Sequence, residues 1–449
     1  MMTKVKGFFT NLRQYPSAVV GFAIILFLIG LSIFTMIYIP YDEAIELWKG
    51  SNPIWLEYPR HAKPAWINIF PGVNKPKTIM VDSREAAATK EILYSEDGFT
   101  ESVVTLPFDF TYDDFPTEIN VSFYSEFEET RPHVDLYWRT PDGNQIPLGG
   151  LSVGRELLHR LSQNTQLQRR LGGLIPHVGL FAGSNPDRDN LKPVKGRYEL
   201  VIEGLTFEEG SNFEAKLIVY GQVHGIAGTD HLRRDLSIAL LWGTPIALAF
   251  SLAAAVGTSI SGLVLGAIGS WFGGWVDSLI QRLTELTMIL PALPIYIMVG
   301  LFFSRSLWVI LATAIVLSLF GGSKSYRSMF IQIKEAPYIE AARAYGASNT
   351  RIIFRYLIPR VIPTLIPSFV TAVPGFIFLE SGLAILGVGD PVLPTWGKII
   401  DEAQRRGALY NGHYYWMLEP LAMLLVTSLA FAAFGFALDR IFNPRLRRL

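Results

Sequence analysis

Long uncharged stretches alternate with short charged ones over much of the chain, a pattern typical of helices that cross a membrane. The first is a mostly apolar run over 18–39, which would be about 33 Å long as a helix and could cross a bilayer. Lys4, Lys6 and Arg13 precede it. Because the run is long and lacks a small-residue cleavage site, we predict a retained membrane anchor and not a signal peptide.

Charged residues mark off five further uncharged stretches. They lie at 236–276, 286–304, 306–323, 361–379 and 420–438. Each of the last four has the length of one crossing, whereas the first could hold one long helix or two short ones. A single crossing that ends near Ser270 places the basic residues of 324–360 and 440–448 in the cytoplasm, as the positive-inside rule requires. We therefore predict six transmembrane helices with both termini in the cytoplasm.

The segment between the first two predicted crossings follows the period of β-strands. Apolar and polar residues alternate in four runs, at 118–124, 133–138, 197–202 and 213–220. We expect the last two runs to pair around the turn at 208–210, and residues 154–171 to form a helix. This predicts a mostly-β, sandwich-like domain inserted between transmembrane helices 1 and 2.

Charge separates this insertion from the rest of the chain. The formal net charge of the protein is zero, but 41–224 contains 27 acidic and 18 basic residues, and the remainder contains 12 and 21. Half of all residues are apolar and only 17% are charged, a composition that excludes a disordered chain or an ordinary cytosolic enzyme. The chain has no cysteine, so disulfides, thiolate metal sites and cysteine catalysis are excluded.

The insertion contains little that indicates catalysis. Residues 150–154 match the pattern Gly-x-Ser-x-Gly, but a nucleophile elbow around Ser152 would require a strand-to-helix turn in an α/β sheet. A glycine-rich turn is the expected structure, and His133 is expected to be structural. No metalloprotease motif or phosphate-binding loop occurs. Of the three classes enzyme, receptor and docking module, the last fits this domain best.

A helix–turn–helix pattern stands out in the basic loop after the fourth predicted crossing. Propensity predicts a short helix up to Tyr345, and Gly346 suits the stop of that helix. A second helix should begin with Ser348 or Asn349 as its cap and run to Pro359. A transverse helix, a turn and a helix returning to the membrane are expected.

The motif in this loop resembles the EAA loop of permeases from ATP-binding-cassette importers. The resemblance rests on Glu340-Ala341-Ala342, Gly346 and the later Leu-Ile-Pro at 357–359. A second segment, Gly228-Thr229-Asp230 with Arg234-Asp235, resembles the motif before the second span of dipeptide/oligopeptide/nickel permeases. Arg233 stands where that family usually has glycine.

Two later segments extend the resemblance. Residues 380–389, with Pro-Thr-Trp-Gly at 394–397, are similar to a signature of the same family, and Asp439 with 443–445 resembles its closing Leu-Asp-Pro-Arg. Together the matching segments cover the N-terminal anchor and 216–449. The chain is identified as a member of this permease family, in its second, OppC/DppC-like subunit. Family members typically have a far shorter segment in place of the insertion.

The resemblance implies a multi-pass protein of the prokaryotic inner membrane. The expected domains are 1–40 with helix 1, the extracytoplasmic insertion 41–224, and a permease core 225–449 with the EAA loop at about 334–360. The implied partners are a second, OppB/DppB-like permease subunit, two ATPase subunits, an extracytoplasmic solute-binding protein and the lipid bilayer, without nucleic acid. The chain itself is expected to be no enzyme and to hold no cofactor or metal, since ATP and Mg belong to the ATPase subunits.

The resemblance also implies roles for single residues. Coupling to the ATPases is expected from Tyr338, Glu340, Ala341, Ala342 and Gly346. Glu380, near the outer end of the fifth span, is a candidate for a structural hydrogen bond or for contact with solute. Prolines that interrupt the fifth helix, Pro374 beside Gly375 among them, are candidate hinges of a gate, as are two prolines in the third helix. The solute is expected to be a peptide, with nickel or an oligosaccharide as alternatives. A receptor or docking protein that acts through its ectodomain is the alternative from another class.

Overall fold

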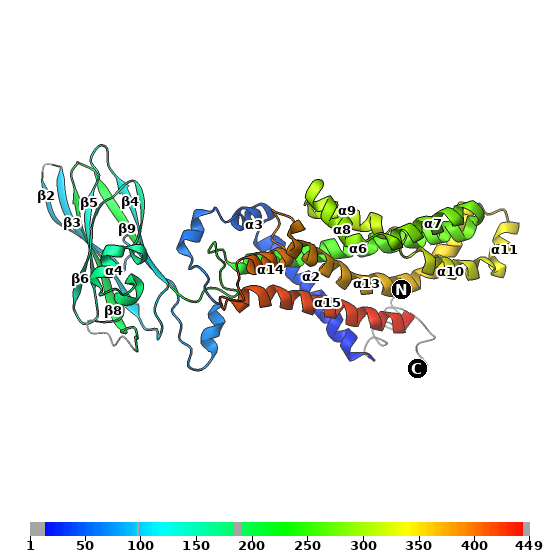
Figure 1. Ribbon diagram of the computed structural model, residues 1–449, viewed down its shortest axis with the longest axis horizontal. Coiled ribbons are helices and arrows are strands. Elements are labelled where there is room, and N and C mark those ends of the chain that lie inside the picture. The colour runs from blue at the N-terminus through cyan, green and yellow to red at the C-terminus, as the bar shows by residue number, and fades with distance from the viewer. Residues whose placement is uncertain (1–13, 97, 184–189, 443–449) are drawn as a thin grey trace. The chain divides into compact units, whose positions relative to one another are not determined.

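The computed structural model describes residues 14–96, 98–183 and 190–442, and the chain forms two compact units (Figure 1). One unit contains Met1–Lys49 and Ile238–Leu449, and the other contains Gly50–Ser237. The first unit is helical and the second is built mainly of strands. The closing motif at 443–445 lies outside the described residues.

Within its described residues, the helical unit contains four helices that are long and apolar enough to cross a membrane. Three are continuous α-helices, and the fourth includes α13 and the turns on either side of it. They are α2 (Pro16–Tyr38), α6 (Leu236–Phe272), Asn349–Val388 with α13 (Ile358–Leu383), and α15 (Tyr414–Phe442). Residues 236–272 form one helix, as the charge pattern predicts for this stretch. Helix α13 packs against α15, and α15 packs against α2 (Figure 1).

Two further pairs of helices are bent, and here the predicted boundaries are wrong. Helices α7 (Gly274–Ile289) and α8 (Ala292–Phe302) meet at 79°, and α9 (Leu307–Ser318) and α10 (Ser323–Lys334) meet at 47°. The uncharged stretch 286–304 is thus not one helix, and it is broken where Pro291, one of the two prolines noted in the third predicted helix, precedes α8 with extended backbone. Four to six spans result, depending on whether each bent pair crosses the membrane once.

Three shorter helices complete the helical unit among the described residues. They are α3 (Tyr41–Trp48), α11 (Pro337–Ala344) and α14 (Trp396–Arg405). Tyr41 of α3 contacts the ring of Trp242 in α6 edge to face, at 5.6 Å between centroids. Trp396 at the start of α14 donates its indole N–H to the carbonyl of Leu240 at 2.9 Å. The helical unit thus keeps its short helices against α6.

The second unit is a β-sandwich, as the alternating pattern predicts. One sheet has the order β1-β9-β4-β7 and the other the order β2-β3-β8-β5-β6, and the strand pairs within both sheets are antiparallel. The strands are β1 (Ile79–Asp82), β2 (Thr89–Glu96), β3 (Phe99–Phe110), β4 (Glu118–Glu126), β5 (His133–Arg139), β6 (Gln145–Ser152), β7 (Glu156–Arg160), β8 (Gly196–Thr206) and β9 (Asn212–Tyr220).

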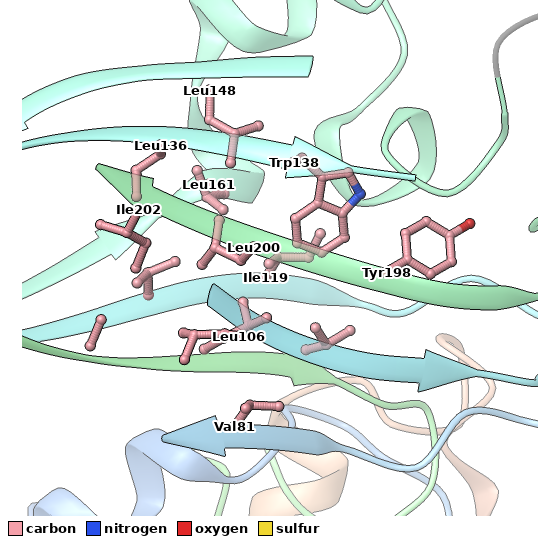
Figure 2. Packing of buried hydrophobic residues seen from close by; sticks show 14 of the residues in the cluster. Val81, Leu106, Ile119, Leu136, Trp138, Leu148, Leu161, Tyr198, Leu200 and Ile202 are labelled. Atoms are coloured by element: carbon pink, nitrogen blue, oxygen red, sulfur yellow. The ribbon is translucent and has the colours of Figure 1, made fainter. Parts of the chain in front are cut away.

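The two sheets enclose one hydrophobic core (Figure 2). Alternate residues of the long strands point inward, so that Leu136 and Trp138 of β5 lie opposite Ile202 and Leu200 of β8. The indole of Trp138 donates a hydrogen bond to the Leu180 carbonyl at 3.1 Å, which satisfies the polar atom of this fully buried side chain. Burial of large apolar side chains from both sheets supplies the main driving force for folding of this unit.

Two details of the predicted β domain are wrong. Strands β8 and β9 belong to different sheets, so the turn at 208–210 crosses between sheets and does not close a hairpin. Residues 154–171 are mostly not helical, because the first part is strand β7, paired with β4, and only α4 (Thr165–Arg170) is an α-helix. Leu157 and Leu158 match a helical period, but in the structure the pairing with β4 overrides that local preference.

The Gly-x-Ser-x-Gly pattern is not the expected glycine-rich turn, because residues 150–152 belong to strand β6. Ser152 ends the antiparallel strand β6 opposite His133, and the next element is strand β7 and not a helix. His133 lies in β5 with its Nε2 atom 3.8 Å from the carboxylate of Asp135, at the surface. This arrangement is not a nucleophile elbow.

Candidate functional site

The loop that resembles the EAA motif folds as the local sequence predicts. Helix α11 begins with Pro337 in its first turn and ends at Ala344, with Tyr345 as its C-cap, and Gly346 follows with a φ of +75°. The amide of Gly346 donates to the carbonyl of Arg343 at 2.9 Å, and the amide of Ala347 donates to the carbonyl of Ala342 at 3.0 Å. Glycine is the residue that adopts this left-handed conformation at least cost, which explains why the helix stops here.

Helix α11 has one buried anchor and an exposed face. Ile339 is fully buried in a cluster with residues of α6, α10 and the start of α13. The guanidinium of Arg343 lies 4.3 Å from the ring centroid of Trp271. On the other side Tyr338, Glu340 and Ala341 are exposed, and Tyr345 is 92% exposed. Three of the five predicted coupling residues thus share one accessible face, Ala342 is half-buried and Gly346 forms the turn.

The chain returns to the helical unit through a capped turn. Ser348 accepts a hydrogen bond from the amide of Arg351 at 3.4 Å, so of the two predicted caps it is the one used. Helix α12 (Asn349–Ile352) and a π-type turn (Ile353–Leu357) then lead directly into α13. Because Ile352 and Leu357 are buried in the same cluster as Ile339, α11 is joined to α13 by packing as well as by sequence.

Glu380 is buried near the end of α13 and is hydrogen-bonded. It is 6% exposed, and its carboxylate accepts from the hydroxyl of Ser381 at 3.2 Å. Gly397 packs so closely that a Cβ atom there would lie 2.6 Å from the Cα atom of Ser381. The two signature segments, 380–389 and 394–397, therefore meet around Glu380.

The predicted interruption of the fifth helix is wrong. Pro363, Pro367 and Pro374 all lie inside the continuous helix α13, and a Cβ atom on Gly375 would meet no neighbour within 4 Å. The irregular turns lie instead at the two ends of α13, at Ile353–Leu357 and Ala384–Val388. A helix can keep its course through a proline where neighbouring groups satisfy the freed carbonyl.

A charged cavity lies beside the second signature segment and is not evident from the sequence. It has a volume of about 220 Å³ and is lined by charged side chains of both signs, Arg305, Asp390, Lys398, Asp401, Glu402 and Arg405 among them. Asp390 is 9% exposed and accepts hydrogen bonds from the amides of Leu307, Val392 and Leu393. Its carboxylate therefore holds the loop before α14 against the start of α9.

The Gly-Thr-Asp motif before α6 is built around a buried ion pair. The guanidinium of Arg234 lies 2.5 Å from the carboxylate of Asp230, and both side chains are almost fully buried. Asp230 also accepts from the amides of Leu232 and Arg234 at 2.8 and 2.9 Å. Burial raises the pKa of Asp230, whereas the guanidinium and the two amides act in the opposite direction. Removing either partner would leave an uncompensated buried charge.

The other motif residues hold the chain at its entry into α6. Gly228 has a φ of +74°, and its carbonyl accepts from the amide of Leu236 at 3.1 Å. The hydroxyl of Thr229 donates to the Pro59 carbonyl at 2.6 Å and accepts from the amide of Ala62 at 2.9 Å. Asp235, the residue before α6, accepts from the amide of Ser237 at 2.8 Å, as an N-cap carboxylate does.

Arg233, at the position where glycine is usual, retains the backbone conformation of glycine. Its φ is +69°, which is unfavourable for a residue with a Cβ atom. Its side chain donates to the carbonyl of Tyr58 at 2.7 Å and to the carboxylate of Glu118 in β4 at 2.5 Å. The guanidinium also lies 4.5 Å from the ring centroid of Tyr220 in β9. Arg233 thus ties the motif to the sandwich, a role that the sequence does not reveal.

Comparison with known proteins places these features in a family. Residues 239–448 match the family described as binding-protein-dependent transport system inner membrane component. The dipeptide transport system permease protein DppC of Alkalihalophilus pseudofirmus is 30% identical over 226 residues, which are 49% of this chain and 72% of that protein. DppC of Bacillus subtilis is 29% identical over 222 residues, 49% of this chain and 69% of that protein.

A third relative has a different solute in its name. The peptidoglycan transport system permease protein YejE of Agrobacterium fabrum is 30% identical over 178 residues, 39% of this chain and 47% of that protein. A helical unit with several helices long and apolar enough to cross a membrane, together with the family match, defines a multi-pass membrane permease. The chain belongs to the family of binding-protein-dependent transport system inner membrane components.

The contacts of Arg233 lead to a prediction. Replacing Arg233 with glycine removes the cost of its backbone conformation, roughly 1–3 kcal/mol, but leaves Glu118 without its partner. Because the lost contacts comprise an ion pair, a hydrogen bond and a cation–π contact, we expect a net loss of about 2 kcal/mol in the free energy of unfolding. Thermal unfolding of the purified full chain measures this loss.

An exposed ion pair provides the control. Lys195 and Asp113 are both more than half exposed, so Lys195→Gln should change the free energy of unfolding by less than about 0.5 kcal/mol. Equal or higher stability of Arg233→Gly relative to the parent chain would show that the side chain does not fasten the motif to the sandwich.

Proposed function

We propose that this chain is one of two permease subunits of an ATP-binding-cassette importer that takes up peptides. The named relatives include dipeptide and oligopeptide permeases, and this chain shares their membrane region. The observation that carries the proposal is helix α11, which is fixed by the buried Ile339 and presents Tyr338, Glu340 and Ala341 outward.

The proposed coupling step uses α11 as a rigid contact for an ATPase subunit. Ala341 and Ala342 are small enough for close approach of a partner's backbone, and Glu340 can pair with a base on the partner. Movement of α11 is passed to α13 through the buried cluster around Ile339, Ile352 and Leu357. ATP and Mg are bound and consumed in the ATPase subunits, and the chain itself performs no hydrolysis.

The proposed topology has six crossings, with each bent helix pair counted as one. Both termini and the α11 loop are then cytoplasmic, and the β-sandwich is extracytoplasmic, as the positive-inside rule favours. In terms of sequence the domains are 1–40, the insertion 41–224 and the permease core 225–449. The complete importer also contains the second permease, two ATPase subunits and a solute-binding protein in the bacterial inner membrane.

The β-sandwich is proposed to dock the solute-binding protein over the outer mouth of the pathway. Its net charge of −9 over 41–224 suits a partner with a basic surface. In the helical unit, Glu380 is proposed to fasten the signature segments to α13, because its carboxylate is buried and hydrogen-bonded. Pro374 and Gly375 lie one to two turns earlier in the same helix and are proposed to allow it to bend during gating.

The first prediction tests coupling. Gly346→Val should leave assembly intact but uncouple ATP hydrolysis from uptake, because a β-branched residue strongly disfavours the φ of +75°. A steric clash would not contribute to this effect, since a Cβ atom at position 346 would meet no neighbour within 4 Å. Gly346→Asn is the matched control, because asparagine tolerates this conformation and should keep most of the uptake. Normal uptake by the valine variant would contradict the role of the turn.

The second prediction tests topology. Asn144 and Thr350 are exposed, and the chain has no cysteine of its own. A membrane-impermeant maleimide applied to intact spheroplasts should label Asn144→Cys and not Thr350→Cys, and both should react after the membrane is opened. The reverse pattern of labelling would place the sandwich in the cytoplasm.

The third prediction tests docking. Ile79 of β1 lies opposite Val219 of β9, so residues 79–220 can be replaced by a short Gly/Ser linker that spans roughly 5 Å. The assembled complex should then bind its solute-binding protein more weakly and lose uptake. Unchanged affinity and uptake in an intact complex would contradict the docking role.

A further inference from the structure

A group of apolar side chains is exposed on the β unit, outside the sandwich. We define the apolar patch as Trp66, Ile69, Phe70 and Ile226, which are 45, 82, 57 and 80% exposed. The first three belong to the 3-10 turn Ala65–Ile69 and the residue that follows it. Side chains of this size are usually buried, so their joint exposure calls for an occupant.

The patch is held in shape by hydrogen bonds inside the turn. The indole of Trp66 donates to the carbonyl of Ile226 at 3.0 Å, and the amide of Ala65 donates to the carbonyl of Gly225 at 2.9 Å. The side chain of Asn68 donates to the carbonyl of Lys75 at 2.8 Å and accepts from its amide at 3.0 Å. The polar groups of Trp66 and Asn68 thus form their hydrogen bonds with other groups of the same unit.

This internal pairing favours lipid over protein as the occupant. Apolar side chains that insert at a membrane surface need no hydrogen bonds from the lipid, whereas a protein interface carries about one hydrogen bond per 100–200 Å² across the contact. The area agrees. An aromatic side chain buries about 150–250 Å² in full, so four partly exposed side chains fall short of the roughly 800 Å² per partner of a standard interface.

The charge around the patch points in the same direction. Residues 58–81 contain Arg60, Lys63, Lys75 and Lys77 and no acid, although the insertion as a whole is strongly acidic. Lys75 pairs with Asp114, but Arg60, Lys63 and Lys77 form no ion pair with any other residue that the structure describes. Basic residues beside exposed aromatic and aliphatic side chains are typical of segments that bind anionic membrane surfaces.

The chain keeps this patch within reach of a bilayer. Ile226 lies ten residues before α6, a candidate membrane span, and ten extended residues reach at most about 36 Å. We propose that the apolar patch inserts into the interfacial region of the membrane and that Arg60, Lys63 and Lys77 bind anionic lipid headgroups there. This contact requires only that the chain spans a membrane, and it is independent of the solute and of the coupling proposed above.

Spin labels on single introduced cysteines can test this contact. Ile69→Cys places the label in the patch, and Ile92→Cys is the matched control, an isoleucine of β2 that is 67% exposed on the same unit. Both variants are measured in the assembled complex, with the other subunits made cysteine-free, in vesicles of phosphatidylcholine with phosphatidylglycerol. We expect the label at 69 to collide more often with oxygen than with a water-soluble nickel chelate, and the label at 92 to show the reverse order.

Two results would overturn the proposal. A label at 69 that prefers the nickel chelate, as at 92, would place the patch in water. An immobilised label at 69 that neither reagent reaches would show that another protein, such as the second permease, covers it.

The electrostatic part has its own test. Either phosphatidylcholine alone or the substitutions Arg60→Gln, Lys63→Gln and Lys77→Gln together should lower the ratio of oxygen to nickel collisions at 69. An unchanged ratio in both cases would contradict binding of anionic headgroups. If the ratio falls in the triple variant but not in vesicles of phosphatidylcholine alone, the basic residues do not act through anionic lipid.

Discussion

The β unit depends on a pairing between the segment that enters it and the segment that leaves it. Residues 61–65 run beside 222–230, and five backbone hydrogen bonds join them, among them Lys63 to Gln222 and Thr229 to Ala62, at 2.8 and 2.9 Å. The Thr229 hydroxyl adds contacts to Pro59 and Ala62, and the Asp230–Arg234 ion pair is buried just behind them. An inserted domain can move freely if its two ends are separate. Here the two ends pair with each other, so the entering and leaving segments are ordered parts of the β unit.

The sequence predicts the elements better than their partners. Alternation over 118–124 and 133–138 predicts strands β4 and β5 because each has one buried face, a local property. Which strands lie side by side is decided by packing of the whole core, so the assignment of β8 and β9 to different sheets is not visible in either segment. The same holds for 154–171, where pairing with β4 turns a leucine-rich segment into strand β7. In the helical unit, long uncharged runs predict α2, α6 and α15, whereas such a run does not show that the chain breaks at Pro291 before α8.

In the candidate site, too, some features follow from the local sequence and others only from the fold. The stop at Gly346 and the cap at Ser348 follow from the conformational preferences of single residues, so the sequence predicts them and the structure confirms the local fold. Ile339 is different. It lies between two predicted coupling residues and carries no motif of its own, yet it is the side chain that fixes α11 to the cluster below it. Likewise the contact between the signature segments at Glu380 joins residues 13 to 17 positions apart, and only the fold shows that Gly397 must be small there.

Arg233 shows how a permease motif can accommodate a large insertion. In the turn before α6 the backbone must adopt a positive φ, which glycine does without a side chain and without strain. A residue with a Cβ atom is strained in that position, so its side chain must offer contacts that outweigh the cost. The contacts of Arg233 all go to the inserted unit, to Tyr58, Glu118 and Tyr220. A chain without the sandwich would lack two of these three partners and would have no use for arginine here. Arginine in place of glycine at position 233 is therefore favourable only because the sandwich supplies partners for its side chain.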